Sequence, residues 1–249
     1  MKISVITVCF NSENTIERTI ESVLAQKYKN FEYIIVDGGS SDGTINIINR
    51  YKDFLKAIVS EKDEGIYDAI NKGIKIAEGD IISIIHSDDA FFNINVFDNV
   101  VSNFQNNLNL DCLIGTTIIN KYNSKKIHRK YNPKIFRNWM LYFGFSPPHP
   151  STFIKKNIYD KHGMYKTNYE IAGDFEFYLR VILKNKISYK TLDEKYIIMK
   201  TGGKSSKSIK SNIISTKEIL KSFRENEIYS NLFFVLLRFP LKLIQLIYK

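Results

Sequence analysis

The sequence has little cysteine and no apolar run that resembles a membrane span. Only Cys9 and Cys112 occur among the 249 residues, and both lie in or beside apolar runs, so we expect buried thiols rather than a disulfide and a cytosolic protein. In the apolar C-terminal part the longest uninterrupted run is Leu232–Leu237, whereas a transmembrane helix needs about 20 mostly apolar residues. Met1–Phe10 has one lysine and runs directly into polar Asn11, so we interpret it as a strand rather than a signal peptide.

Apolar, aromatic and basic residues are abundant. Hydrophobic residues make up 44% of the chain, with 17 Phe and 15 Tyr, which excludes a disordered protein. The 36 Lys and Arg against 26 Asp and Glu give a net charge of +10. Residues 200–249 hold ten of the basic residues and three glutamates, so most of the excess is C-terminal. This asymmetry indicates an anionic partner, which could be a membrane surface, a phosphate-bearing substrate or nucleic acid.

The N-terminal half alternates short apolar runs with helical patterns. The runs at 31–36 and 80–85 are nearly continuous and β-branched, as in strands that are covered on both faces of a parallel sheet. We therefore expect a doubly wound α/β domain with a mostly parallel sheet flanked by helices. The predicted strands are 2–9, 31–37, 57–60 and 80–85, and the predicted helices are 14–26, 43–51, 66–77, 175–183 and 213–225. Loops and short helices on the substrate side should follow Thr117, with a Gly- and Ser-rich loop at 201–211.

Polar residues follow each predicted strand of the N-terminal half. Because ligands of open parallel sheets bind beyond the carboxyl ends of the strands, we expect these residues to share one acid-rich crevice. Adjacent Asp88 and Asp89 repel each other, which makes sense if they share Mg²⁺ or Mn²⁺, and such a cation would in turn hold a diphosphate. Taken alone, the pair is explained equally well by an exposed turn with a helix cap. The residues in question are Asn11 and Ser12, Asp37 to Gly43, Glu61 to Gly65, and His86 to Asp89.

An ordered set of motifs resembles the inverting family 2 glycosyltransferases, which have the GT-A fold and use nucleotide-diphosphate sugars. The resemblance covers most of residues 2–205. Its motifs are Val5-Ile-Thr-Val-Cys-Phe-Asn11, Thr19-Ile-Glu-Ser-Val-Leu-Ala-Gln26, Phe31 to Thr44, Asp68-Ala-Ile-Asn-Lys-Gly73, Ser87-Asp-Asp89, His149-Pro-Ser-Thr-Phe153, Gly173-Asp-Phe-Glu-Phe-Tyr-Leu-Arg180 and Gly202-Gly203.

The resemblance assigns donor-side roles. It implies that the end of the first strand and Asp37 clasp the base and ribose, that two residues line the donor pocket, and that an acidic motif binds Mn²⁺ or Mg²⁺ and the diphosphate. The first position of this motif, often Asp in the family, is His86 here, which either touches the nucleotide or only packs. The donor-side residues are Phe10, Asn11, Asp37, Asp68, Lys72, His86, Ser87 and Asp88, and the metal ligands are Asp88 and Asp89.

Inverting transfer requires a general base for the acceptor hydroxyl. Asp174 falls where the family places this base, at the start of a helix, and Glu176 is the second candidate. Without the resemblance, Asp174 reads more simply as a helix N-cap. His149 lies between prolines that could aim its ring at the phosphates or the acceptor, but a structural loop histidine fits as well. No covalent intermediate is needed, so we expect no nucleophilic Ser or Cys.

The C-terminal segment has the pattern of an interfacial helix. Arg238, Lys242, Gln245 and Lys249 recur at helical spacing on an otherwise apolar sequence, and Lys204, Lys207 and Lys210 could add attraction to anionic lipid. The alternative is a helix that packs on the domain or on a second subunit.

These observations predict a cytoplasmic glycosyltransferase that is peripheral on the inner face of the cell membrane. We expect a nucleotide-sugar-binding half at 1–117, an acceptor-side half at 118–210 and membrane-associating helices at 211–249. The expected donor is a UDP-sugar, and the expected acceptor is a glycan on polyprenyl diphosphate in bacterial surface-polysaccharide synthesis, with no nucleic-acid partner. Two rivals are a nucleotidyltransferase, which should show a Gly-rich basic loop after the first strand, and an inactive nucleotide- or membrane-binding module. The sequence does not indicate the oligomeric state.

Overall fold

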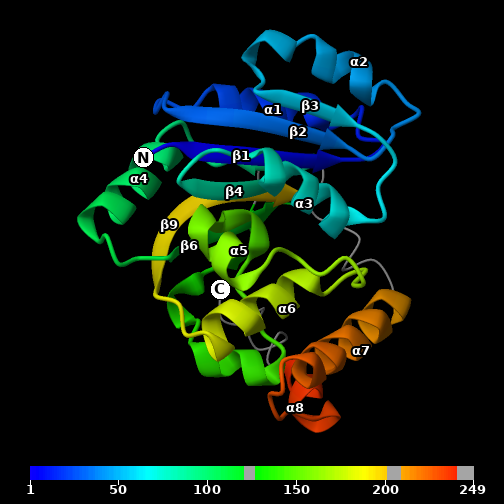
Figure 1. Ribbon diagram of the computed structural model, residues 1–249, viewed down its shortest axis with the longest axis vertical. Coiled ribbons are helices and arrows are strands. Elements are labelled where there is room, and N and C mark those ends of the chain that lie inside the picture. Colours follow the sequence, from blue (N-terminus) through cyan, green and yellow to red (C-terminus); the bar gives the residue numbers. More distant parts are fainter. Residues whose placement is uncertain (121–126, 201–208, 240–249) are drawn as a thin grey trace.

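The computed structural model describes residues 1–120, 127–200 and 209–239, which form an α/β fold around one mixed sheet (Figure 1). The described strands form a nine-stranded sheet in the order β3-β2-β1-β4-β8-β6-β9-β5, with β7 paired to β6. Their bounds are β1 Ile3–Cys9, β2 Phe31–Asp37, β3 Ala57–Ser60, β4 Ile81–His86, β5 Ala90–Phe91, β6 Cys112–Asn120, β7 Ile127–Tyr131, β8 Thr152–Lys155 and β9 Tyr189–Lys200.

The sheet is parallel where the sequence predicts it and mixed beyond that. Strands β3, β2, β1 and β4 pair in parallel. Strand β8 then lies antiparallel between β4 and β6, so β6 and its parallel partner β9 again point in the direction of β4. Only β5, β7 and β8 among the described strands run the other way. The predicted mostly parallel α/β fold is confirmed, and short antiparallel strands complete it.

Helices cover both faces of the sheet. Because successive strand residues point to opposite faces, Ile3 and Val5 pack with α1, α2 and α4, whereas Ile6 and Val8 pack with α3, α5, α6 and α7. Their bounds are α1 Ile16–Leu24, α2 Thr44–Asn49, α3 Ile66–Ile76, α4 Val96–Asn106, α5 Lys156–His162, α6 Gly173–Tyr178, α7 Ile209–Glu225 and α8 Leu232–Leu236. Short helical turns η1 Lys52–Phe54, η2 Pro133–Ile135, η3 Asn138–Phe143 and η4 His149–Ser151 link them, and η5 Leu179–Lys184 is a π-helical continuation of α6.

The helix predicted at 175–183 therefore divides into α6 and η5. The helix predicted at 213–225 begins earlier, at Ile209. Most of the loop predicted at 201–211, including Gly202, Gly203, Lys204 and Lys207, lies outside the described residues.

The C-terminal helices pack onto the domain rather than away from it. Ile219 and Phe223 of α7 join the core beside α6, and Val235 of α8 is fully buried. In Figure 1, α7 and α8 flank the end of the molecule that is opposite α2. No helix of the described part of the chain is long and apolar enough to cross a membrane.

The prediction for Arg238 is wrong. We expected this residue to open an exposed basic stripe, but its side chain is buried at 3% exposure. Its guanidinium donates a hydrogen bond to Thr216 at 2.8 Å and lies over the ring of Phe239. Burial lowers the pKa of Arg238. The apolar stem of arginine packs well on a domain surface, and the described part of the tail follows the packing alternative. The remaining stripe residues Lys242, Gln245 and Lys249 lie outside the described residues.

Candidate active site at the ends of the parallel strands

The loops after β1 and β2 are joined by hydrogen bonds at the carboxyl edge of the sheet. Asn11 has a left-handed backbone with φ of 47°, a conformation that asparagine tolerates better than most residues. Its amide donates to the Ser40 hydroxyl at 2.8 Å, and its side-chain oxygen accepts from the Ser41 amide at 2.9 Å. Phe10 is 59% exposed. The structure thus presents an exposed aromatic ring beside a fixed polar turn, as a base-binding role for Phe10 and Asn11 would require.

Asp37 shapes this turn from inside. Its carboxylate is fully buried and accepts hydrogen bonds from the Gly39 and Ser40 amides at 3.2 and 3.0 Å. The hydroxyls of Ser40 and Ser60 also donate to it, the latter at 2.8 Å. Asp37 thereby ties the ends of β2 and β3 together. A direct role on the nucleotide stays a prediction, because in this conformation the carboxylate is occupied by the protein.

Asp63 was expected in the acid-rich crevice but was given no role there. Its carboxylate approaches Gly38 so closely that a Cβ on Gly38 would lie 2.4 Å from Asp63 Oδ2 and 3.5 Å from the Phe10 ring. Asp63 and Phe10 therefore both lie beside Gly38, at the carboxyl edge of the sheet. The resemblance assigned no function to the residues directly after β3, which is why Asp63 had no role.

Asp68 and Lys72 form an ion pair on α3. The Lys72 ammonium lies 3.2 Å from Asp68 and 2.8 Å from Glu61. Neighbouring Glu61 and Asp68 hold the pKa of Lys72 above its usual value. Both side chains also bond to the backbone of the loop after β3, which contains Asp63. Lys72 would have to exchange these carboxylates for a donor phosphate, and the donor-pocket role stays a prediction.

The acidic motif after β4 joins the same edge. Ser87 shares a 2.8 Å hydroxyl hydrogen bond with Ser12 of the β1 loop. Asp88 is half-buried, whereas Asp89 is fully buried and neither of its carboxylate oxygens has a hydrogen-bond partner among the described residues. Burial, together with the Asp88 carboxylate, raises the pKa of Asp89 well above its usual range. A buried carboxylate without partners is costly and asks for an explanation.

A divalent cation fits this motif. Mg²⁺ and similar hard cations are commonly held by one or two carboxylates together with waters and substrate phosphates. Across residues 1–120, 127–200 and 209–239, no three His, Cys, Asp or Glu side chains are grouped to hold a metal by themselves. Asp88 could supply a direct ligand, and unpartnered Asp89 would carry negative charge behind it only with a cation nearby, because burial otherwise favours its neutral form. The donor set therefore fits a cation that is completed by a diphosphate.

The structure brings His86 and His149 together. Their rings stack with centroids 5.6 Å apart and an angle of 25° between planes. The His149 Nε2 atom lies 2.9 Å from the Tyr165 hydroxyl. Burial, and to a smaller extent the His86 ring, lowers the pKa of His149 to about 3, so this imidazole is neutral at neutral pH. His149 can orient a polar group at the end of β4, but it offers no positive charge to phosphates.

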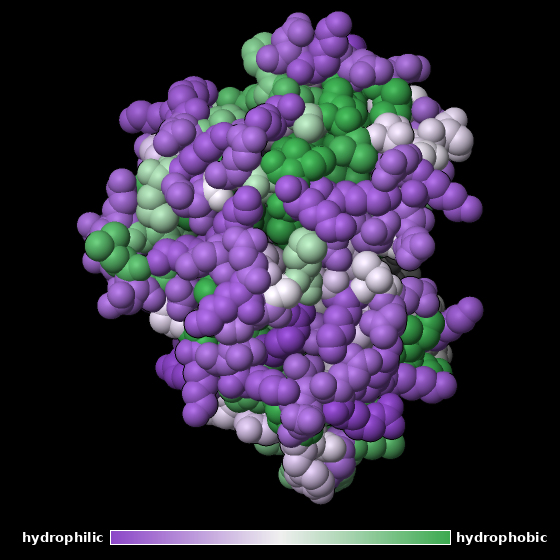
Figure 2. Space-filling view, in the orientation of Figure 1, coloured by the Kyte–Doolittle hydropathy of each residue, from purple (hydrophilic) through white to green (hydrophobic). Residues whose placement is uncertain are grey.

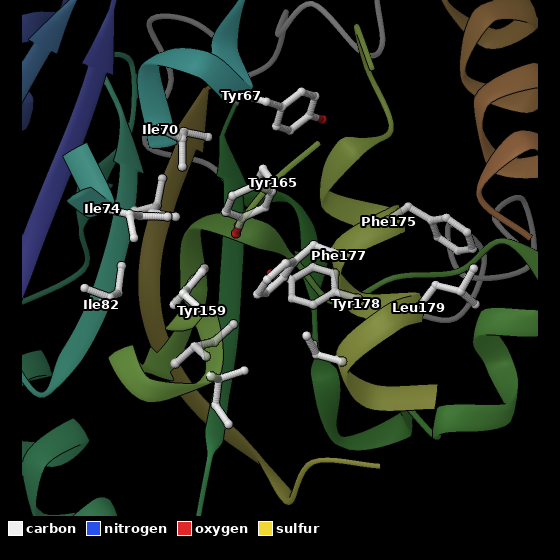
Figure 3. Packing of buried hydrophobic residues seen from close by; sticks show 14 of the residues in the cluster. Tyr67, Ile70, Ile74, Ile82, Tyr159, Tyr165, Phe175, Phe177, Tyr178 and Leu179 are labelled. Carbon is white, nitrogen blue, oxygen red and sulfur yellow. The ribbon is translucent and has the colours of Figure 1, made fainter. Parts of the chain in front are cut away.

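A run of aromatic rings leads from these histidines to Asp174. Tyr165 stacks on Tyr67 of α3 with centroids 5.8 Å apart (Figure 3). The backbone of Tyr165 is held by both ends of the Asn71 side-chain amide, at 2.7 and 3.0 Å. The Tyr67 hydroxyl then donates to the Ile171 carbonyl at 2.8 Å, three residues before Asp174. Side-chain contacts thus connect the end of β4 with the start of α6.

Asp174 has the surroundings of a general base. It is half-buried in the first turn of α6, and its Oδ1 accepts the Phe175 amide hydrogen at 2.8 Å. Burial raises the pKa of Asp174 to about 6, although hydrogen bonds from the Phe175 and Asp174 amides and from Tyr67 oppose the rise. Catalytic bases work best when their pKa lies near the operating pH. A solvated helix cap would have no reason to show this shift.

Glu218 of α7 fixes the loop before Asp174, a role that we did not expect from the sequence. Its carboxylate accepts three backbone amide hydrogens, from Glu170 at 2.6 Å, Ile171 at 2.9 Å and Ala172 at 2.7 Å. Nothing in the local sequence signals this role, since Glu218 lies more than forty residues away in an ordinary helical pattern. Residues 170–172, just before Asp174, are therefore positioned by α7, a helix that we expected to be an appendage.

Glu176, the second candidate base, is committed elsewhere. It is fully buried, and both of its oxygens bond to Arg180 at 3.0 Å. Lys166 lies 3.2 Å away and the Asn226 amide donates at 3.2 Å. A carboxylate enclosed by two cations is neither open to an acceptor nor free to take its proton. This network joins α6 to α7, and we assign Glu176 to it rather than to catalysis.

Comparisons with known proteins find glycosyltransferases that are similar to this chain. An uncharacterized glycosyltransferase of Mycobacterium tuberculosis H37Rv is 31% identical over 191 residues, which are 73% of this chain and 69% of the relative. The Escherichia coli UDP-Glc:alpha-D-GlcNAc-diphosphoundecaprenol beta-1,3-glucosyltransferase WfaP is 42% identical over 88 residues, or 35% of each chain.

Two solved structures share the fold. Staphylococcus aureus TarS 1–349 in complex with UDP-GlcNAc superposes with a TM-score of 0.68 at 20% identity, covering 90% of this chain and 66% of TarS. The mannosyltransferase PcManGT of Pyrobaculum calidifontis in complex with GDP-Man and Mn²⁺ gives 0.67 at 17% identity, covering 90% and 63%.

The family model described as "Glycosyl transferase family 2" matches residues 4–184, which contain the strand-end loops, the acidic motif and Asp174. Together with the fold, this match shows that the chain belongs to glycosyl transferase family 2.

Proposed function

We propose that this chain is an inverting, metal-dependent hexosyltransferase that moves a sugar from a UDP-sugar to a hydroxyl of a glycan acceptor. The observation that carries the proposal is Asp174, a carboxylate with a pKa of about 6 at the start of α6, which side-chain contacts connect with the end of β4 beside the acidic motif. Family membership makes sugar transfer the reaction class. Asp174 supplies what an inverting mechanism needs from the protein.

The proposed step is a single displacement. The acceptor oxygen forms a bond to the anomeric carbon while the bond from that carbon to the diphosphate oxygen breaks. The acceptor proton passes to Asp174, and the electron pair of the broken bond leaves with the nucleoside diphosphate. A divalent cation, Mn²⁺ or Mg²⁺, held by Asp88 with Asp89 behind it would neutralise the charge on that leaving group. Attack from the opposite face inverts the anomeric configuration.

We assign the nucleotide-sugar donor to the carboxyl edge of the sheet, where the loops after β1, β2 and β3 lie side by side. Phe10 offers an exposed ring for the base, while Asn11 and Asp63 offer polar atoms beside it. The names of two similar proteins support a UDP-sugar, since WfaP acts with UDP-Glc and TarS was solved with UDP-GlcNAc. The structure with GDP-Man and Mn²⁺ supports a divalent metal for this fold.

The acceptor is proposed to be a glycan on polyprenyl diphosphate. WfaP, whose name gives a diphosphoundecaprenol acceptor, supports this assignment. Such an acceptor is embedded in a bilayer, so the enzyme would work as a peripheral protein on the inner face of the membrane, in the assembly of a bacterial surface polysaccharide such as an O-antigen, capsule or exopolysaccharide.

Thermal unfolding with nucleotides tests the donor site. Of UDP, GDP, CDP and TDP, we expect only UDP to raise the melting temperature in the presence of Mn²⁺. A ligand at about 100 times its Kd stabilises the native state by about 2.7 kcal/mol, so the increase should be measurable. The Asp174→Asn variant should show the same increase but transfer no sugar. A shift with another nucleotide would contradict the UDP assignment, and transfer by the variant would contradict the assigned base.

The same experiment separates the enzyme from an inactive binding module. A module would bind nucleotide or membrane without releasing UDP from any UDP-sugar in the presence of lipid-linked acceptors. Release of UDP by the wild-type chain that depends on both acceptor and Asp174 would exclude that alternative.

A further inference from the structure

Aromatic side chains gather on the surface between η3 and α8. Six of them form what we call the aromatic patch, namely Trp139, Tyr142, Phe143, Tyr229, Phe233 and Phe234. Three rings are well exposed, Tyr229 at 79%, Phe233 at 67% and Trp139 at 56%. Their neighbours connect them, since Phe143 lies 5.8 Å from Trp139 and 5.5 Å from Phe234 between ring centroids.

The patch surrounds a groove and is rigidly supported. The groove has a volume of about 540 Å³ and is lined by five of the six patch residues together with Glu227 and Ile228. Beneath it, Leu141 and Val235 are fully buried. The Ser230 hydroxyl donates to the Tyr142 carbonyl at 2.9 Å, and Asn231 caps α8 by accepting the Phe234 amide at 3.1 Å. The exposure of these rings is therefore a property of packed elements. In Figure 2, green and pale residues appear at the lower end of the molecule, where Figure 1 places α8.

The charge around the patch selects its partner. The described segments that carry the six rings, 131–148 and 228–239, contain no aspartate or glutamate. Lys134 and Arg137 are exposed on the first of them, close in sequence to Trp139. Glu227 lines the groove, and its carboxylate lies 3.6 Å from the Lys184 ammonium. Exposed Trp and Tyr rings with neighbouring cations are typical of surfaces that lie in the interface of an anionic bilayer.

We propose that the aromatic patch is the surface by which this protein docks on an anionic phospholipid bilayer. The inference deepens the proposed function, on which it rests, because a lipid-linked acceptor has to be met at a membrane. It replaces the exposed stripe expected to begin at Arg238, since the structure buries that residue and exposes Trp139, Tyr229 and Phe233 instead.

Trp139 makes the wild-type protein its own probe. It is the single tryptophan of the chain, so its fluorescence reports on the patch alone. With vesicles of phosphatidylglycerol and phosphatidylcholine we expect its emission to shift to the blue and brominated lipids to quench it, because the ring enters the apolar boundary of the bilayer. Vesicles of phosphatidylcholine alone should give a weaker response. An unchanged spectrum, with no quenching, would overturn the proposal without any variant.

Variants then assign the contact. Tyr229→Ser with Phe233→Ser should reduce co-sedimentation with anionic vesicles by about tenfold or more, given the apolar area that the two rings bury. Phe54→Ser with Leu108→Ser is the matched control, because these exposed residues (66% and 77%) lie elsewhere. Equal loss in both variants, or none in the patch variant, would contradict the assignment.

Two further readouts separate rival explanations. If sedimentation velocity shows a dimer that the patch variant abolishes, and vesicles bind neither form, the patch is a subunit interface and the proposal is wrong. Nucleotide-dependent thermal stabilisation and transfer to a water-soluble acceptor analogue should persist in the patch variant. Their absence in the wild type would instead contradict the proposed function.

Discussion

Replacing Asp174 by asparagine should abolish sugar transfer and at the same time stabilise the folded protein at neutral pH. The wild-type carboxyl group is half-buried, and burial raises its pKa from 3.8 to about 6. The native state therefore binds the Asp174 proton more tightly than the unfolded state does. The stability associated with this group is fully present below about pH 3.8 and is lost as the pH rises through about 6.

The size of the effect follows from the two pKa values. A rise from 3.8 to about 6 corresponds to at most about 3 kcal/mol of unfolding free energy at neutral pH. Since Asp174 keeps some contact with solvent, we expect about 1–3 kcal/mol. Asparagine has nearly the same shape, carries no charge, and can still accept the Phe175 amide hydrogen that Oδ1 accepts at 2.8 Å. It removes the cost of the charge and leaves the helix start intact.

Urea unfolding of the wild type and the variant at about pH 8 and about pH 4.5 measures this difference. The variant should be more stable at the higher pH, and its advantage should shrink at the lower pH as the wild-type carboxyl becomes protonated. Asp98→Asn, an exposed carboxylate in the first turn of α4, is the control and should show no such gain. A variant that is no more stable than the wild type at about pH 8, or whose advantage is independent of pH, would refute the reasoning.

Three other changes test the walls of the site. Glu218→Gln removes a charge that raises the pKa of Asp174, so the acidic limb of the pH–rate profile should move to lower pH. Because it also weakens three amide hydrogen bonds, kcat should fall more than KM rises and the free energy of unfolding should drop by about 1.5–3 kcal/mol. An unmoved limb would contradict the electrostatic effect of Glu218 on Asp174. Gly173→Ala places a Cβ 2.7 Å from the buried Tyr67 ring and should cost about 1–3 kcal/mol in thermal or urea unfolding; an unaltered midpoint would show that the ring can retreat. Asp88→Asn should remove the Mn²⁺-dependent part of the stabilisation by UDP in thermal unfolding, and retention of that part would place the cation elsewhere.

The sequence predicts the N-terminal half of the molecule well because its signals are local. Runs such as Phe31–Asp37 have the length and β-branching of buried parallel strands, and polar residues directly after them reach one edge of the sheet. The structure confirms this convergence through Ser12 and Ser87, whose hydroxyls meet 2.8 Å apart. The role of Asp174 in transfer is still a prediction, although its surroundings support it.

The other half depends on contacts that no local pattern encodes. Glu218 reaches residues 170–172 only because α7 packs on α6, and His149 meets Tyr165 only because two loops converge. Arg238 was misjudged because helical spacing shows which residues share a face but not which face is covered. Long-range packing decided each of these positions.

The clamp made by Glu218 also bears on how the chain can be divided. The family model ends at residue 184, so a fragment trimmed to the matched region would contain the strand-end loops and Asp174 yet lose the carboxylate that holds 170–172. Such a fragment would also lose β9, which lies between β6 and β5, whereas a chain that ends after β9 would keep the sheet and lose only the helices that include Glu218. In the same way, a chimaera in which the segment after β9 comes from a relative would take on that relative's contacts to residues 170–172, just before Asp174. Sequence changes outside the region matched by the family model would therefore alter the support of residues 170–172 without changing Asp174 or the strand-end loops.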